Sequence, residues 1–61
     1  MPHVTISLLA GRSVDQKRAL VKKVTEAVVE TTGAKPESVA IQIDETTKEN
    51  LAHGGVLFVD N

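Results

Sequence analysis

A long segment with helical periodicity lies between two short segments in which polar and apolar side chains alternate, and this order restricts the fold more than any other feature. Residues 3–9 and 38–44 both place apolar side chains at every second position, which is typical of strands with one covered face. Those positions are Val4, Ile6, Leu8, Val39, Ile41 and Ile43. A strand, a helix and a strand of these lengths predict one right-handed β-α-β unit with two parallel strands.

The segment between the strands is expected to form a helix over about residues 14–32. Ser13, followed three residues later by Gln16, is typical of a capping box at a helix start. Gly33 is well placed to end the helix, and Pro36 prevents the helix from resuming.

The helical segment has an apolar stripe and a charged side. The stripe consists of Leu20, Val24, Ala27, Val28 and Thr31, with Val14 and Val21 at its flank. The charged side consists of Arg18, Lys22, Lys23, Glu26 and Glu30, together with Val29. We expect the stripe to cover one face of the sheet, and Lys22 to pair weakly with Glu26.

The end of the chain is expected to leave the β-α-β unit. Residues 45–53 are polar and predict a loop, and Gly54 and Gly55 favour a turn after it. The apolar run 56–59 is difficult for a monomer of this size to bury, so it predicts a short strand or hairpin that docks on a neighbouring subunit. Because two strands alone are unstable, we expect oligomerisation to complete the sheet.

The size of the chain also favours self-association. Residues 1–61 make one domain of the α/β (α+β) class, and a chain this short buries only about 60% of its unfolded surface. Such chains usually need disulfides, a metal or a partner subunit. The chain has no cysteine, and its two histidines, His3 and His53, lie far apart, so we expect neither a disulfide nor a metal site.

The charge and composition exclude two classes of partner. The net charge is −1, seven basic residues face eight acidic ones, and Phe58 is the only aromatic residue. Nucleic-acid binding needs a basic surface, and stacking on single strands needs aromatic side chains, so we expect no nucleic-acid partner. No apolar run reaches the length of a membrane span and no secretory leader is recognisable, so we expect a cytoplasmic protein.

Proline at position 2 is the feature that suggests chemistry, because no familiar set of catalytic side chains is present. Once Met1 is removed, Pro2 is a secondary amine rather than an amide. An α-amino group has a reference pKa of about 8, and an apolar pocket or a nearby arginine lowers the pKa of such an amine. A base of that kind suits general acid–base catalysis, so Pro2 is a candidate for moving a proton between two atoms of a substrate.

Several short motifs follow Met1 and Pro2 in a definite order. They are Gly11-Arg12-Ser13, Asp15-Gln16-Lys17, Ala34-Lys35-Pro36, Ser38-Val39 and Gly54-Gly55. Each motif alone is weak, but their joint order and spacing resemble the 4-oxalocrotonate (2-hydroxymuconate) tautomerase family over essentially the whole chain. The resemblance implies a β-α-β subunit, a hexamer built as a trimer of dimers, and active sites at subunit boundaries. It also implies proton transfer without a cofactor in small unsaturated 2-hydroxy or 2-keto acids.

The resemblance assigns roles to particular residues. Pro2 matches the catalytic proline, and Arg12 matches an arginine that binds a substrate carboxylate, a role that suits a guanidinium. Ala40 stands where the best-studied members have a second arginine, and Leu51 stands where they have a phenylalanine of the pocket. Loss of the arginine removes an electrophile that can be worth about 3 kcal/mol, whereas Leu51 still excludes water. Gln42, on the strand face of Ala40, is a tentative neutral replacement for that arginine, although an exposed or interface glutamine is the commoner case.

Two other functions are compatible with the same sequence. The same fold and proline also suit a hydratase-dehalogenase or a decarboxylase that acts on unsaturated acids. The changes at Ala40 and Leu51 are also compatible with a weakly catalytic oligomeric module that binds a small ligand.

Overall fold

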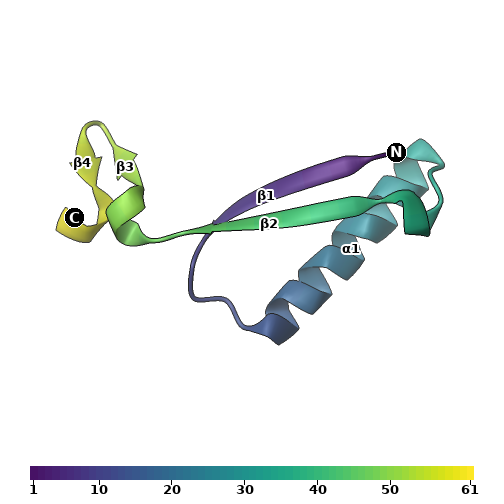
Figure 1. Cartoon of the computed structure of the whole chain (residues 1–61), viewed down its shortest axis with the longest axis horizontal. Coiled ribbons are helices and arrows are strands. Elements are labelled where there is room, and N and C mark those ends of the chain that lie inside the picture. The colour runs from purple at the N-terminus through teal and green to yellow at the C-terminus, as the bar shows by residue number, and fades with distance from the viewer.

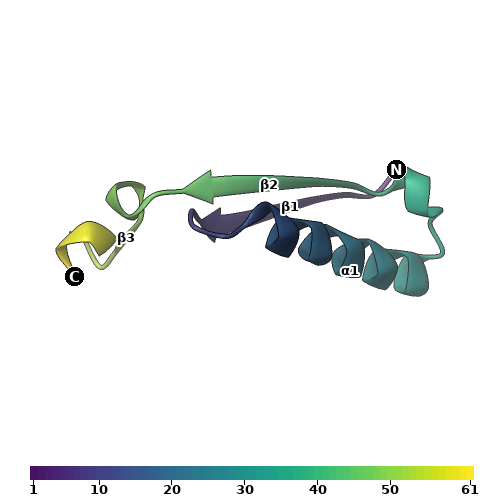
Figure 2. The ribbon, with the colours of Figure 1, turned by 90° about the horizontal axis from the view of Figure 1, so that it is seen from below.

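The computed structural model describes all residues from Met1 to Asn61. Strand β1 (His3–Leu9), helix α1 (Val14–Thr32) and strand β2 (Ala40–Thr46) form a β-α-β unit, and α1 covers one face of the sheet (Figures 1 and 2). The two strands are parallel and pair over their whole length, from His3 opposite Ala40 to Leu9 opposite Thr46. The predicted unit with two parallel strands is therefore confirmed.

Both ends of α1 follow from the local sequence. The Ser13 hydroxyl accepts a hydrogen bond from the Gln16 backbone N–H at 3.1 Å, and the Gln16 side-chain Oε1 accepts one from the Ser13 backbone N–H at 2.8 Å. Gly33 adopts the left-handed conformation with φ 76° and donates its N–H to the Val29 carbonyl at 3.0 Å. The capping box, the glycine stop and the helix range 14–32 were all predicted correctly.

The face of α1 that packs on the sheet is rotated from the predicted stripe. Its half-buried residues are Lys17, Leu20, Val21, Val24, Thr25, Val28 and Val29. Ala27, Thr31 and the flanking Val14 are exposed and Val29 is half-buried, so the prediction was wrong at these four positions. The Thr31 hydroxyl donates back to the Ala27 carbonyl at 2.8 Å and therefore needs no partner on the sheet.

The charged side of α1 is exposed, as predicted, but its ion pair is not the expected one. Arg18 pairs with Asp15 at 2.6 Å on the surface of the helix, and no ion pair joins Lys22 to Glu26. A second ion pair joins Lys17 to Glu45 at 2.6 Å, and it connects the first turn of α1 to β2.

The second strand begins and ends two residues later than predicted, at Ala40 and Thr46. Pro36–Ser38 forms a 3-10 turn in which Ser38 donates its N–H to the Lys35 carbonyl at 2.9 Å. This bond holds Ser38 in the turn, so Ser38 does not pair with β1 in the sheet. The predicted loop 45–53 is also only partly correct, because 45–46 belong to β2 and 48–50 form another 3-10 turn.

The chain ends in a small hairpin. A hairpin was one of the two structures predicted for this tail. Strand β3 (Ala52–His53) pairs antiparallel with β4 (Val56–Leu57), and residues 58–60 form a last 3-10 turn. Gly54 and Gly55 make the connection with φ 59° and 82°, a backbone conformation that favours glycine. The hairpin lies beyond the end of β2, apart from the β-α-β unit (Figure 1).

An isolated subunit has no fully buried side chain. It is elongated, with extents of 43 × 24 × 14 Å, and its covered sheet face is closed only by α1. Apolar side chains of the tail remain exposed, with Val56 at 50%, Leu57 at 38% and Val59 at 58%. No helix in the chain is long and apolar enough to cross a membrane.

Candidate functional site

Pro2 directly precedes β1, at the end of the sheet where both parallel strands begin. Its carbonyl accepts a hydrogen bond from the Ala40 N–H at 3.0 Å, so the start of β2 holds the backbone of Pro2 in place. Pro2 is half-buried and His3 is exposed, as the predicted alternation of strand faces requires. Met1 is 95% exposed, so its side chain makes little contact with the subunit and contributes little to packing.

Arg12 lies at the opposite end of β1, in the connection that leads to α1. The Ala10 N–H donates to the Thr46 carbonyl at 2.7 Å and anchors the start of this connection to the end of β2. The capping box at Ser13 fixes its other end. Arg12 itself is exposed and forms neither an ion pair nor a side-chain hydrogen bond within the subunit. Its guanidinium is therefore available to an anion.

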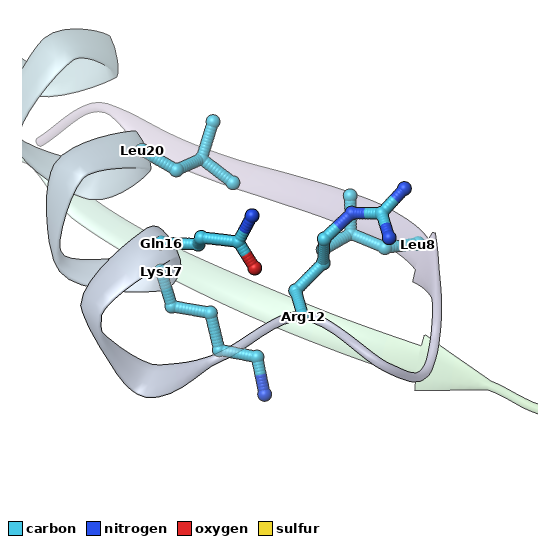
Figure 3. A pocket seen from close by; sticks show the side chains of 5 residues that line it. All are labelled: Leu8, Arg12, Gln16, Lys17 and Leu20. Carbon is cyan, nitrogen blue, oxygen red and sulfur yellow. The ribbon is translucent and has the colours of Figure 1, made fainter.

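A shallow pocket of about 260 Å³ lies beside Arg12. It is lined by Leu8, Arg12, Gln16, Lys17 and Leu20 (Figure 3). The two leucines come from β1 and α1 and give the pocket an apolar wall. The polar side chains come from the connection and from the first turn of α1, so the pocket combines two cations and an amide with apolar surface. This pocket was not predicted from the sequence, although Gln16 was predicted as part of the helix cap.

One subunit does not bring Pro2 and Arg12 together. The seven residues of β1 separate them, and a strand of that length extends about 20 Å. A small unsaturated acid is much shorter than this, so it cannot contact both side chains of the same chain. Any site that uses both residues must combine two subunits.

Gln42 lies in the middle of β2, opposite Thr5 of β1. It is exposed on the sheet face that α1 does not cover, and its Nε2 donates to Asp44 Oδ1 at 2.8 Å. The alternation of faces puts Pro2 on the other side of the sheet, so Gln42 does not face Pro2 within one subunit. The role suggested for Gln42 stays a prediction.

Leu51 lies between the 3-10 turn at 48–50 and the hairpin. It is half-buried, and its carbonyl accepts a hydrogen bond from the Phe58 N–H at 2.8 Å. Phe58 also packs against His53, with 4.9 Å between the ring centroids, a contact that was not predicted from the sequence. The hairpin and the N-terminus lie at opposite ends of the subunit (Figure 1), so Leu51 is remote from Pro2 of its own chain.

Comparison with known proteins gives a consistent result over the whole chain. A family model described as tautomerase enzyme matches residues 2–61. A 2-hydroxymuconate tautomerase from Bacillus subtilis is 53% identical over 60 residues, which are 98% of this chain and 97% of that protein.

Solved structures agree with these sequence matches. The crystal structure of YwhB, a homologue of 4-oxalocrotonate tautomerase, is 48% identical, has a TM-score of 0.95 and is covered over 98% of both chains. A heterohexamer 4-oxalocrotonate tautomerase from Chloroflexus aurantiacus is 25% identical with a TM-score of 0.91, and the match covers 98% of this chain and 97% of that one.

Proposed function

This chain belongs to the tautomerase enzyme family, and on that premise we propose that it ketonises or tautomerises a small unsaturated 2-hydroxy or 2-keto acid of the 2-hydroxymuconate type. The main support is that the match to the family model begins at Pro2 and continues to the last residue. A 2-hydroxymuconate tautomerase that is 53% identical over nearly all of both chains supports the choice of substrate class.

In the proposed mechanism, Pro2 acts as the base and then as the acid after Met1 has been removed. The unprotonated nitrogen takes the proton of the 2-hydroxyl group of the enol. The O–H electron pair then forms the carbonyl, and the electrons of the conjugated double bonds move to a carbon atom further along the substrate. That carbon receives the proton back from the Pro2 ammonium, so no other reactant or cofactor is needed.

Arg12 of a neighbouring subunit would bind a carboxylate of the same substrate. The support is the length of β1, which keeps Pro2 and Arg12 of one chain apart, and the free guanidinium of Arg12. A guanidinium binds a carboxylate through two parallel hydrogen bonds and thereby fixes its orientation as well as its position.

We propose a homo-oligomer, most simply a hexamer made as a trimer of dimers. A subunit without a single buried residue lacks a core of its own, and the exposed apolar residues of the tail lie on an arm that extends away from the β-α-β unit. The similar 4-oxalocrotonate tautomerase of Chloroflexus aurantiacus, which is a heterohexamer, supports this proposal.

The remaining candidates would complete the site across the same boundaries. Leu51 would exclude water from the proline and keep its pKa low, because a less hydrated site disfavours the protonated amine. Gln42 would donate a neutral hydrogen bond to the 2-keto oxygen once an assembly brings it near a Pro2 of another chain. The alanine at position 40 supplies no charge for that purpose.

Pro2→Ala tests the central step. We expect kcat/KM for 2-hydroxymuconate, followed by ultraviolet absorbance, to fall about a hundredfold or more, as is typical for loss of a general base. The intact mass of each preparation must show that Met1 is absent. If Pro2→Ala is as active as the parent, Pro2 is not the base.

A further inference from the structure

The Gln16 side chain has a donor group that the subunit does not use. Its Oε1 accepts the hydrogen bond from the Ser13 N–H at 2.8 Å, so the capping box fixes which end of the amide faces the connection. The Nε2 group, which carries two N–H donors, has no partner in the protein. Gln16 lines the same pocket as Arg12, and Figure 3 shows both side chains at the edge of that pocket.

The other groups around the pocket determine what it accepts. The Lys17 ammonium is held by Glu45 at 2.6 Å, so that charge is already neutralised locally. Arg12 has no such partner and leaves one free cation at the pocket. Leu8 and Leu20 supply apolar surface beside it. This combination suits one carboxylate that is attached to a short apolar chain.

We propose that Gln16 determines specificity for the carboxylate by donating an N–H of its amide to the same carboxylate that Arg12 binds. This assignment rests on the proposed function, because it assumes that the Arg12 pocket receives the substrate. A carboxylate has about four lone-pair positions, and a bidentate arginine occupies two of them. A third donor is therefore accommodated, and it rejects a neutral amide or ester in the same position, because a neutral group accepts a weaker hydrogen bond than an ionised one.

Gln16 has one role in the capping box and a second, proposed role at the pocket, and Gln16→Glu separates the two. A glutamate at this position of a capping box is as usual as a glutamine, so it still accepts the hydrogen bond from the Ser13 N–H. The substitution replaces the amide donor by a carboxylate oxygen of nearly the same size. The helix start is preserved, and only the group presented to the pocket changes from a donor to an anion.

The first measurement is steady-state kinetics of the assembled Gln16→Glu enzyme with 2-hydroxymuconate. We expect KM to rise at least about tenfold, because the substrate carboxylate loses a hydrogen bond and meets a like charge, while kcat stays within about twofold. Glu26→Gln is the matched control, since it exchanges the same two groups on the exposed side of α1. We expect this control to leave both KM and kcat within about twofold of the parent.

The second measurement is binding without turnover, which separates this inference from the proposed function. Sorbate, a dienoate without a 2-hydroxyl group, cannot be ketonised, and sorbamide is its neutral counterpart. Calorimetric titration should show sorbate binding about tenfold more weakly to Gln16→Glu than to the parent, and sorbamide binding weakly to both.

Three results would overturn the assignment. Equal binding of sorbate by the parent and Gln16→Glu would exclude the contact, even if the parent is an active tautomerase. Dissociation of the Gln16→Glu assembly, seen by analytical ultracentrifugation, would show that the pocket is a subunit contact. A fall in kcat with an unchanged KM would show that Gln16 acts elsewhere. A parent without turnover whose sorbate binding weakens in Gln16→Glu would instead refute the proposed reaction and retain the carboxylate contact.

Discussion

The two ends of β1 carry different functional groups. At its start, Pro2 is half-buried and held by the Ala40 N–H, and the neighbouring sheet positions offer no cation. After its end, Arg12 lies beside a pocket with an amide and an apolar wall, but with no group suited to act as a base.

In the proposed site, each subunit would supply two separate halves. The proline half is Pro2, whose carbonyl accepts a hydrogen bond from the Ala40 N–H, and the arginine half is the Arg12 guanidinium, which would bind a carboxylate. Since about 20 Å of strand separates the halves, the proposed catalysis is a property of the assembly and not of the chain.

The largest effect on activity is expected when the nitrogen of Pro2 is blocked chemically and every side chain is kept. A chemically synthesised chain that begins at Pro2 can be made with a free or an N-acetylated nitrogen. Acetylation converts the amine into an amide, so we expect kcat/KM with 2-hydroxymuconate to fall by about 10²- to 10⁴-fold. The free chain is the control. Comparable turnover by both chains would remove Pro2 from the mechanism.

A nearly equal loss of activity is expected when the subunits are prevented from assembling, because the two halves then stay apart. Leu57→Glu places a charge in the apolar part of the hairpin, where Leu57 is 38% exposed in the isolated subunit. If that surface docks on a neighbour, the buried charge opposes assembly, and we expect smaller species in analytical ultracentrifugation together with loss of turnover. Asp60→Glu, in the last 3-10 turn, is a conservative control. An intact and active Leu57→Glu assembly would show that the hairpin does not form the contact.

Mixing Pro2→Ala subunits with Arg12→Ala subunits tests directly whether the halves come from different chains. Arg12→Ala should raise KM at least about tenfold, because it removes a charged and bidentate partner. When Pro2→Ala and Arg12→Ala subunits are unfolded together and refolded, about one site in four draws both intact residues from different chains. We expect kcat/KM of the mixture, measured at low substrate concentration, to rise above that of either variant to about that fraction of the parental value. A mixture no better than its components would mean that each site lies within one chain.

The sequence predicted the β-α-β unit well, because the signals that define it are local. The capping box and Gly33 set the limits of α1, and alternation set the faces of β1. The start of β2 was placed two residues early, because alternation continues through residues that a 3-10 turn after Pro36 removes from the ladder. The packed face of α1 was predicted wrongly at Ala27, Val29 and Thr31, because these three side chains differ too little in size to define a face.

The family resemblance implied active sites at subunit boundaries, and the sequence agreed with this. Pro2 and Arg12 are separated by nine residues, and the alternating segment 3–9 between them predicted a strand that keeps them apart in one chain. The pocket beside Arg12 depends on Leu8 and Leu20, which meet only after α1 folds back on β1. Gln16 was recognised as a cap because that role is local, whereas its position beside the pocket depends on the tertiary fold.

The smallest expected effect concerns the ion pair between Lys17 and Glu45, which ties the arginine half to the sheet. Lys17→Met removes the charge and retains the apolar stem that lines the pocket. The side chains of the pair are 26% and 35% exposed, so solvent screening limits its contribution to about 0.2–1 kcal/mol. Thermal unfolding of Lys17→Met, Glu45→Gln and the double variant should give a coupling energy in that range. If the pair also positions the connection that holds Arg12, KM for 2-hydroxymuconate should rise about two- to threefold in each single variant, and the double variant should add little. An additive loss of stability with an unchanged KM would show that Arg12 is positioned by the capping box and the Ala10–Thr46 hydrogen bond alone.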